Sequence, residues 1–308
     1  MLRSAALARR FFSSGAKVNK VGVIGAGLMG SGIAQISAAA GQDVVLVDMR
    51  GTALEGGLKR IKGSLGHFAK KAAPGEEAAY VDNVMGKIQG ADAIDALADC
   101  DLIVEAIVEN MDVKKNLFAD LGKVAKQGAI LSSNTSSLSV TEMGAASGRP
   151  ESMVGLHFFN PVPLMALVEV VNTAATSPEI LQGALDWSKS VGKKPITCKD
   201  TPGFVVNRLL VPYLSESIRL LERGVASKED IDLGMRLGAG HPMGPIHLGD
   251  YVGLDTCLFI LEGWSQAYPE EQIFQVPDTL RKLVEEGKTG RKVGQGFYKW
   301  DGDRVVKE

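Results

Sequence analysis

Short apolar runs alternate with helical stretches in the first part of the chain. Residues 20–25, KVGVIG, form a β-branched apolar run that ends in glycine, and residues 43–48, DVVLVD, form a second run. The segment between them, residues 28–41, is rich in small and apolar residues and stops at Gly41, as expected for a helix. A strand, a helix and a strand within about thirty residues predict a βαβ unit and therefore a parallel sheet.

Further apolar runs of strand length continue this rhythm. They lie at residues 101–107, 129–134, 153–158, 167–171 and 195–199, with a polar helical stretch at residues 112–125. Continuous apolar runs are typical of strands that are buried on both faces of a sheet. The predicted fold class is therefore α/β, with a Rossmann-type, doubly wound and mostly parallel sheet domain.

The pattern changes after about residue 200, where long helical periodicities replace the strands. Residues 204–224, 250–268 and 277–287 are each predicted to form one helix. Ser227 begins the sequence SKED, a capping-box signal for another helix start. The second part of the chain is therefore predicted to be an all-α domain.

These patterns predict the following division of the chain. Residues 18–199 are predicted to form a Rossmann-like domain with a helical arm at about residues 51–90, and residues 200–308 a helical domain. Residues 1–17 are basic and serine-containing, and the first acidic residue of the chain is Asp43. This composition is typical of a mitochondrial presequence and predicts a location in the mitochondrial matrix, although a disordered basic tail is the alternative.

Composition excludes several classes of function. The 308 residues are 45% hydrophobic and 23% charged, and 34 Lys and Arg against 36 Asp and Glu give a net charge of -2. Such a balance gives no support for a nucleic-acid binder. The three cysteines lack metal-ligand spacing, so no metal site is expected. No stretch reaches the roughly 18 apolar residues of a transmembrane helix, so none is predicted.

A glycine-rich turn joins the first predicted strand to the first predicted helix. The sequence GAGLMG matches G-x-G-x-x-G in the context that gives the pattern meaning. Asp48 ends the second strand, where a carboxylate binds an adenosine ribose and repels a 2′-phosphate, so NAD is the expected cofactor. A strand-end carboxylate without a ligand is the alternative for Asp48. The expected cofactor-binding residues here are Gly25, Gly27, Leu28, Met29, Gly30 and Asp48.

Polar segments follow three of the later strands. They are VEN at 108–110, SNTSS at 133–137, and HFFNPVP at 157–163. Residues at the carboxyl ends of parallel strands are expected to surround the nicotinamide. Ser136 and Ser137 can donate hydrogen bonds to a substrate oxygen, but the same residues also suit a turn or a helix N-cap.

His157 and Glu169 suggest acid–base chemistry. Oxidation of a secondary alcohol requires a base for the hydroxyl proton, and imidazole has a suitable pKa. Glu169 is a charge inside the apolar run LVEVV, so it requires a partner. A carboxylate on one ring nitrogen would fix the tautomer of the imidazole. The alternative is a structural histidine with an unrelated glutamate.

At these residues the chain resembles the L-3-hydroxyacyl-CoA dehydrogenases, and most of all the mitochondrial short-chain type. The segments that carry the resemblance are GAGLMGSGIAQ, LIVEAIVEN, SNTSSL, GLHFFNPVPLMALVEVV, CKDTPGFVVNRLLVPYL, GAGHPMGP, LGDYVGLD and GQGFYKW, in that order along the chain. The resemblance implies oxidation of a 3-hydroxyacyl-CoA to a 3-oxoacyl-CoA, with reduction of NAD, as a step of fatty-acid β-oxidation.

The resemblance also implies a role for each matching residue. His157 would be the general base and Glu169 its orienting partner, and Ser136 and Asn207 would contact the reacting end of the substrate. Asn160 would lie at the nicotinamide and thioester end. Residues expected to contact the cofactor are Glu109, Lys114, Ser136, Asn160 and Lys292.

The basic stretch LKRIKGSLGHFAKK at residues 58–71 carries five Lys or Arg and no acid. A polyanion such as coenzyme A could bind there, and the resemblance implies CoA contacts at Ser64 and Lys71. A basic helix face that is simply solvated is the alternative. The loop KAAPGEEAAY that follows is shorter than expected in the family, which leaves the geometry of CoA binding open. The resemblance further implies a homodimer formed through the helical domain.

Two other functions remain open from the sequence. A 3-hydroxyisobutyrate-type dehydrogenase shares the glycine-rich turn and a helical second domain, but uses a lysine in its helical part. A non-catalytic, crystallin-like NAD-binding protein is the alternative outside the enzymes. His157, Glu169, Ser136 and Asn207 together argue against a purely structural role.

Overall fold

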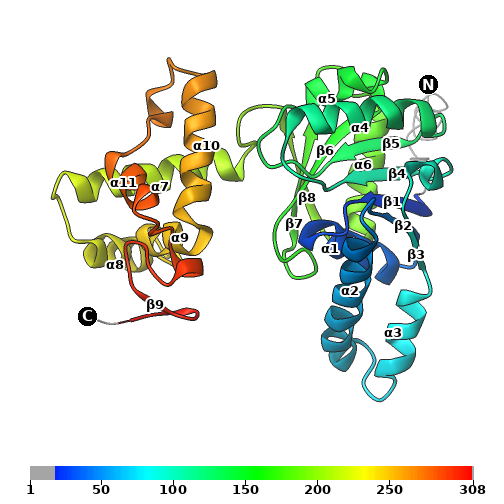
Figure 1. Cartoon of the computed structure of the whole chain (residues 1–308), viewed down its shortest axis with the longest axis horizontal. Helices are drawn as coiled ribbons and strands as arrows, with labels where there is room; N and C mark the ends of the chain where they lie inside the picture. Colours follow the sequence, from blue (N-terminus) through cyan, green and yellow to red (C-terminus); the bar gives the residue numbers. More distant parts are fainter. Residues whose placement is uncertain (1–17, 307–308) are drawn as a thin grey trace, which may run out of the picture. The chain divides into compact units, whose positions relative to one another are not determined.

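The structure is a computed structural model that describes residues 18–306, and the predicted presequence at residues 1–17 lies outside the described residues. The chain divides into two compact units, the first ending at Phe204 and the second beginning at Val205 (Figure 1).

An eight-stranded sheet forms the centre of the first unit, with the strand order β3-β2-β1-β4-β5-β6-β7-β8. Neighbouring strands are parallel from β3 to β6, β7 is antiparallel to β6, and β8 is parallel to β7. The mostly parallel sheet predicted from the sequence is therefore confirmed. The strands are β1 (Lys20–Ile24), β2 (Asp43–Val47), β3 (Ile88–Ala91), β4 (Leu102–Glu105), β5 (Ile130–Ser133), β6 (Met153–Phe158), β7 (Leu167–Asn172) and β8 (Lys194–Lys199).

Helices cover both faces of this sheet. One apolar cluster joins the sheet to α1, α2, α3 and α6, and a second joins its other face to α4 and α5, which Figure 1 shows side by side. A buried layer on each face is what makes the sheet doubly wound. The helices of this unit are α1 (Leu28–Ala39), α2 (Gly51–Ala72), α3 (Glu77–Met85), α4 (Met111–Val124), α5 (Val140–Ala146) and α6 (Pro178–Ser190), with 3-10 turns η1 (Ile94–Leu97) and η2 (Pro150–Ser152).

The predicted arm consists of α2 and α3, which pack against each other and extend beyond the sheet (Figure 1). Ile61, Leu65 and Ala69 form the buried stripe of α2 at helical spacing, while its basic residues lie on the exposed side. The end of the predicted arm range, about 51–90, belongs to strand β3 (Ile88–Ala91) instead. The sequence IQGA lacks the apolar run that predicted the other strands, and none of its four residues is fully buried at this edge of the sheet.

Helices also form most of the second unit. They are α7 (Val206–Glu222), α8 (Lys228–Gly238), α9 (Pro245–Val252), α10 (Leu254–Ala267) and α11 (Asp278–Glu285), with 3-10 turns η3 (Gln272–Phe274) and η4 (Arg291–Val293). A short hairpin, β9 (Trp300–Asp301) and β10 (Arg304–Val305), follows them. Ser227 is the N-cap of α8, as predicted, since its Oγ accepts a hydrogen bond from Asp230 N at 3.1 Å.

The single helix predicted at residues 250–268 is wrong. Gly253 separates α9 from α10, and its φ of 106° lies where a helix cannot continue. Apolar periodicity runs through Gly253 because both helices bury side chains in the same core. Asp250, at the end of α9, is buried and accepts hydrogen bonds from Phe297 N and Tyr298 N at 2.9 Å each.

Among the described residues, no helix is long and apolar enough to cross a membrane.

Candidate active site

The sheet has a topological switch point between the neighbouring strands β1 and β4, where the order in which the chain adds strands reverses. From β1 the sheet continues through β2 to β3, whereas from β4 it continues through β5 to β6 on the other side. Loops that leave the carboxyl ends of such a pair diverge and leave a crevice, where ligands of doubly wound sheets bind. The glycine-rich turn follows β1, and the segment from Ala106 to Asn110 follows β4.

The space around each glycine of the turn explains why a side chain is absent there. A Cβ at Gly25 would lie 2.4 Å from the carbonyl oxygen of Ala106, and one at Gly30 would lie 1.8 Å from that of Gly25. Both glycines are therefore required for close packing of β1, β4 and α1. A Cβ at Gly27 would meet no protein atom within 4 Å. The space beside Gly27, at the N-terminus of α1, is thus free for a pyrophosphate.

The other predicted residues of this turn surround the same space. Asp48 follows β2, and its carboxylate accepts hydrogen bonds from Ala26 N at 3.0 Å and Arg50 N at 3.1 Å. These bonds hold the carboxylate against the turn. Leu28 is 65% exposed at the first position of α1, and Met29 packs partly against the core. The residues of the turn therefore fit a dinucleotide.

A buried charge cluster lies after β4. Lys114 is 1% exposed, and its Nζ lies 2.8 Å from Glu105 Oε1 and 2.9 Å from Glu109 Oε2. Glu105 is fully buried and also accepts hydrogen bonds from Ile107 N at 2.7 Å and Ser133 Oγ at 2.5 Å. Glu105 was not singled out from the sequence. The signal was the one that identified Glu169, namely an acid inside an apolar strand.

Glu109 connects this cluster to the segment that follows β5. Its Oε1 accepts hydrogen bonds from Thr135 Oγ1 at 2.6 Å and from Ser136 N at 3.0 Å. Burial by itself raises the pKa of the Glu109 carboxyl, but the charge of Lys114 and these hydrogen bonds outweigh it and hold the pKa below its usual range. Glu109 is therefore an anion, and three of the predicted residues, Glu109, Lys114 and Ser136, lie together.

His157 and Glu169 are direct partners across the antiparallel strands β6 and β7. The distance from His157 Nδ1 to Glu169 Oε2 is 2.6 Å, and the two residues are 5% and 0% exposed. Since an ionised carboxylate only accepts hydrogen bonds, Nδ1 carries the proton and Nε2 of the neutral ring is an acceptor. The sequence predicted a contact between these residues, and the antiparallel register provides it.

The loop after His157 is held by contacts that the sequence did not indicate. Phe158 N donates to Asn134 Oδ1 at 2.9 Å. Lys193, which is 7% exposed, donates to the carbonyl oxygens of Val162 and Met165 at 2.5 Å and 2.7 Å. These bonds fix the loop that carries the predicted residue Asn160, whose peptide bond to Pro161 is cis.

The remaining predicted residues lie on other elements. Ser64 and Lys71 are on α2, seven positions apart and therefore on about the same side of the helix. Asn207 is in the first turn of α7, and Lys292, in η4, forms an ion pair with Asp255. Asn207 and Lys292 belong to the second unit. Within residues 18–306, no group of His, Cys, Asp or Glu is arranged to hold a metal ion.

A dinucleotide turn at a topological switch point, together with an imidazole–carboxylate pair, defines a NAD-dependent oxidoreductase. The comparisons with known proteins agree. Residues 20–201 match the model of the 3-hydroxyacyl-CoA dehydrogenase NAD binding domain, and residues 203–300 match that of the 3-hydroxyacyl-CoA dehydrogenase C-terminal domain.

Individual relatives resemble the chain over nearly its full length. It is 52% identical to the human protein named hydroxyacyl-coenzyme A dehydrogenase, mitochondrial, over 92% of this chain and 91% of that protein. It is 51% identical to a probable 3-hydroxyacyl-CoA dehydrogenase of Caenorhabditis elegans, over 92% and 93%. The structure of (S)-3-hydroxybutyryl-CoA dehydrogenase from Ralstonia eutropha matches with a TM-score of 0.88 and 39% identity, over 92% of this chain and 100% of that one.

The chain belongs to the 3-hydroxyacyl-CoA dehydrogenase family, an oxidoreductase family with a NAD-binding domain. This membership supports the first function considered from the sequence and not the 3-hydroxyisobutyrate-type or crystallin-like alternatives.

Proposed function

We propose that the protein oxidises L-3-hydroxyacyl-CoA to 3-oxoacyl-CoA in fatty-acid β-oxidation, with His157 as the general base. The observation that carries this proposal is the 2.6 Å contact between His157 Nδ1 and Glu169 Oε2. A buried carboxylate on Nδ1 keeps Nε2 free of a proton and stabilises the imidazolium that forms when Nε2 accepts one.

Each residue of the proposed site has its own role in the reaction. His157 Nε2 accepts the proton of the 3-hydroxyl group as the bond from carbon 3 to oxygen becomes a carbonyl. NAD, when bound, would supply the acceptor for the hydride that leaves carbon 3. Ser136 and Asn207 bind the reacting end of the substrate. Ser136 is held by Glu109, and Asn207 lies only three residues after Phe204, whose ring contacts the His157 ring.

Cofactor binding is assigned to the crevice between the β1 and β4 loops. The turn residues Gly25, Gly27, Leu28, Met29 and Gly30 bind the pyrophosphate and Asp48 binds the adenosine ribose. The nicotinamide end is assigned to Glu109, Lys114, Ser136, Asn160 and Lys292. The ordered anion of Glu109 and the open space beside Gly27 support this assignment.

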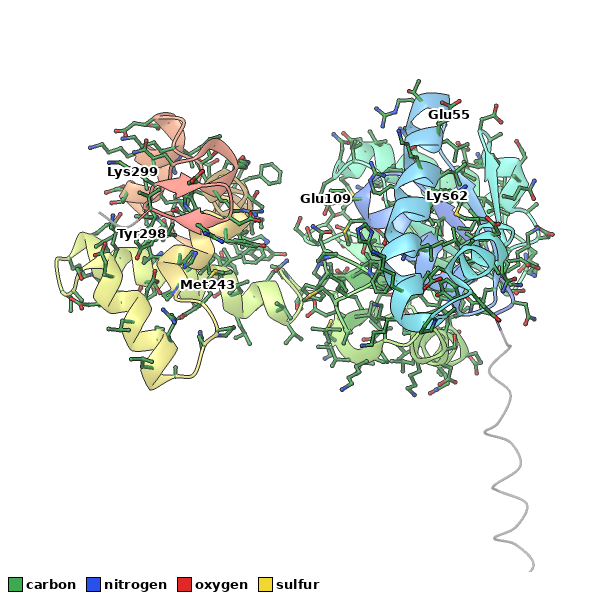
Figure 2. The ribbon with its side chains drawn as sticks, turned by 90° about the horizontal axis from the view of Figure 1, so that it is seen from below. Glu55, Lys62, Glu109, Met243, Tyr298 and Lys299 are labelled. Atoms are coloured by element: carbon green, nitrogen blue, oxygen red, sulfur yellow. The ribbon has the colours of Figure 1, made fainter. Side chains whose placement is uncertain are left out.

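Coenzyme A is assigned to α2. Ser64 and Lys71 lie on about the same side of this helix, and further basic residues such as Lys62 lie along it, as Figure 2 shows with Glu55 and Lys62 labelled. The arm carries the positive charge that a polyphosphate requires. Replacement of Lys71 by Glu is expected to raise the KM for acyl-CoA while leaving the KM for NAD unchanged.

The reaction is tested by the absorbance of NADH after mixing the purified protein with NAD and L-3-hydroxybutyryl-CoA. Thioesters with longer chains, up to palmitoyl length, determine the chain-length preference in the same assay. Free 3-hydroxyisobutyrate serves as the control substrate. We expect turnover of the 3-hydroxyacyl-CoA thioesters and none of 3-hydroxyisobutyrate. No turnover with any thioester would contradict the proposed reaction.

We further propose that the protein acts in the mitochondrial matrix. The human, pig and rat relatives are named mitochondrial, and residues 1–17 have a basic composition without acid. Import of the full chain into isolated mitochondria, with and without residues 1–17, tests this location. Import that does not depend on these residues would contradict a presequence.

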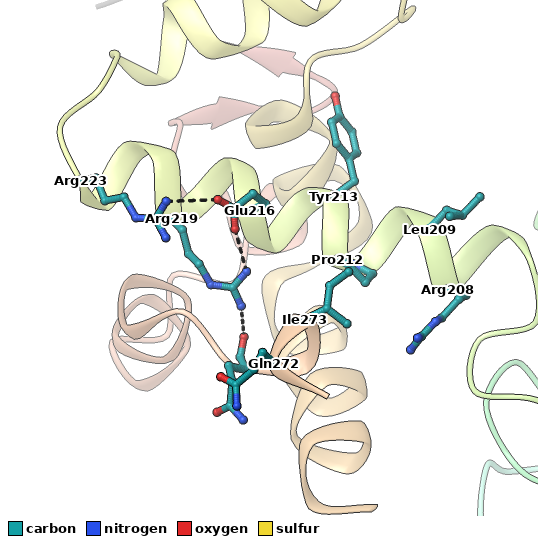
Figure 3. A pocket seen from close by; sticks show the side chains of 10 residues that line it. Arg208, Leu209, Pro212, Tyr213, Glu216, Arg219, Arg223, Gln272 and Ile273 are labelled. Carbon is teal, nitrogen blue, oxygen red and sulfur yellow. Dashed lines mark hydrogen bonds and ion pairs between the residues drawn. The ribbon is translucent and has the colours of Figure 1, made fainter. Parts of the chain in front are cut away.

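We also propose a homodimer through the second unit. Beside α7 lies a groove of about 670 Å³, lined by Arg208, Leu209, Pro212, Tyr213, Glu216, Arg219, Arg223, Gln272, Ile273 and Gln275 (Figure 3). Leu209 and Ile273 are apolar side chains that are 69% and 47% exposed. Glu216 lies among arginines, so the surface carries both charges and can match a second copy of itself.

A further inference from the structure

The segment that joins the two units begins with an anchored turn, Asp200–Phe204. The Asp200 carboxylate accepts hydrogen bonds from Ser139 Oγ at 3.0 Å and from Thr141 N at 2.8 Å at the start of α5. Phe204 N then donates to Thr201 O at 3.0 Å, and Gly203 has a φ of 74°. Proline followed by glycine with positive φ is the pattern of a type II turn. The position of Phe204 is therefore fixed by its neighbours in the chain.

Phe204 itself has an unusual backbone. Its φ is 53°, and within residues 18–306 it is the only residue other than glycine with a positive φ. A bulky side chain is disfavoured in this left-handed region, so the surrounding structure must hold it there. The side chain of Phe204 is nevertheless buried, with 5% of its surface exposed. Such outliers concentrate at functional sites.

The strained backbone aims the phenyl ring at His157. The ring centroids of Phe204 and His157 are 5.6 Å apart and tilted by 56°. Phe159 contacts the same imidazole, with centroids 4.6 Å apart and a tilt of 51°. His157 is thus bounded by two aromatic rings and bonded through Nδ1 to Glu169.

We propose that Phe204 is a positioning residue for His157, and that the turn at residues 200–204 exists to hold its ring against the imidazole. The inference rests on the proposed role of His157 as the base. The phenyl ring keeps the imidazole in the orientation in which Nδ1 meets Glu169 and excludes water from that bond. Without the ring, the imidazole rotates and water competes for the carboxylate, so the base is misaligned.

Three variants separate the ring from the backbone. Phe204→Leu removes the ring but keeps most of the apolar volume, Phe204→Ala removes both, and Phe204→Gly also removes the backbone strain. Phe118→Leu is the control, because Phe118 is fully buried in the same apolar cluster and has no assigned role in the reaction. His157→Gln is assayed in parallel.

Two readouts distinguish positioning from loss of packing. The first is kcat against the KM values, where Phe204→Ala and Phe204→Gly are expected to lose at least about tenfold in kcat with KM nearly unchanged. The second is the proton NMR signal of the hydrogen bond between His157 and Glu169. We expect its exchange with water to accelerate in the Phe204 variants and to stay slow in Phe118→Leu.

Denaturant unfolding tests the backbone strain. Glycine normally destabilises a folded chain more than alanine, but at a left-handed position it is the better residue. Phe204→Gly is therefore expected to unfold at the same or a higher midpoint than Phe204→Ala. The reverse order would overturn the assignment of strain to this residue.

The outcomes separate this inference from the proposed function. If His157→Gln loses turnover while all Phe204 variants keep wild-type kcat and a slowly exchanging proton, the inference is wrong and the proposed function stands. If His157→Gln keeps full turnover, the proposed function is itself wrong. A proton that exchanges equally fast in Phe118→Leu would also overturn the positioning role.

Discussion

Glu169 is a fully buried carboxylate whose Oε2 lies 2.6 Å from His157 Nδ1, and that contact fixes what the histidine can do. Burial requires that the charge be paired, and the antiparallel register of β6 and β7 puts the pair face to face. The position of the acid was visible in the sequence, since a glutamate interrupts an apolar strand. The partner was predicted from chemistry rather than from register, which the sequence did not reveal.

Replacement of Glu169 by Gln is expected to lower kcat by about 10³ to 10⁴, with little change in the affinity for NADH. An amide can donate as well as accept, so it stabilises the tautomer in which Nε2 carries the proton. Steady-state kinetics and NADH titration measure the two quantities, and circular dichroism checks the fold. A variant with wild-type kcat would contradict the role of Glu169 as the orienting partner.

Lys193 is a buried ammonium that bonds to two carbonyl oxygens of the loop after His157. Burial lowers the pKa of this ammonium from its usual value of 10.5. Between the lowered pKa and 10.5, the unfolded chain binds more protons than the folded protein. The contribution of Lys193 to stability therefore rises with pH in that window.

A comparison of the wild type with Lys193→Met tests this dependence of stability on pH. The free energy of unfolding of the wild type, measured in urea from neutral to alkaline pH, should rise relative to that of Lys193→Met across this window. A constant difference between the two would show that the pKa of Lys193 is not lowered by folding. Other titrating groups contribute equally to both proteins and cancel.

The glycine-rich turn is the element in which sequence and structure agree most closely. Strand, glycines and helix were all predicted, because spacing and small residues at fixed positions determine this turn. The loop after β4 was predicted less well. Glu105 lies at the end of β4 and was treated as part of an apolar run, so the ion pair that orders Lys114 was missed.

Two glycines of the turn provide a matched pair of variants. Gly30→Ala is expected to lower the free energy of unfolding by about 1–3 kcal/mol, because its Cβ would overlap the backbone of Gly25. Gly27→Ala should leave stability nearly unchanged, since its Cβ meets no protein atom and its φ of -69° suits any residue. It should nevertheless raise the Kd for NADH at least about tenfold, because the methyl group occupies the space assigned to the pyrophosphate.

Urea unfolding and NADH fluorescence titration separate these two effects. Equal losses of stability in both variants would contradict the steric distinction. Unchanged NADH affinity in Gly27→Ala would contradict the assignment of the pyrophosphate to the space beside Gly27.

Three further features of the fold could not be predicted from the sequence, and each has a physical reason. The reversal of β7 and β8 depends on tertiary packing, because an apolar run of strand length does not encode its direction. The left-handed backbone of Phe204 runs against the preference of its own side chain, so local propensity argues against it. The break at Gly253 was hidden because glycine also occurs inside helices.

The proposed homodimer places a second copy of the chain against the exposed side of α7. Leu209→Asp is expected to convert a dimer to a monomer, since a charge would be buried in the proposed interface. Leu237→Asp is the control, because Leu237 is 77% exposed on α8 and does not line the groove. Light scattering after size-exclusion chromatography measures the mass. A monomeric wild type, or a dimer in both variants, would contradict this interface.

The proposed role of His157 is tested most directly by the turnover of L-3-hydroxybutyryl-CoA by His157→Gln against the wild type, with NADH affinity measured on the same samples. Glutamine keeps a polar side chain of similar size but cannot accept the proton. We predict that kcat falls by about 10² to 10⁴ while the Kd for NADH is unchanged. Wild-type turnover by His157→Gln would contradict the assignment of His157 as the base.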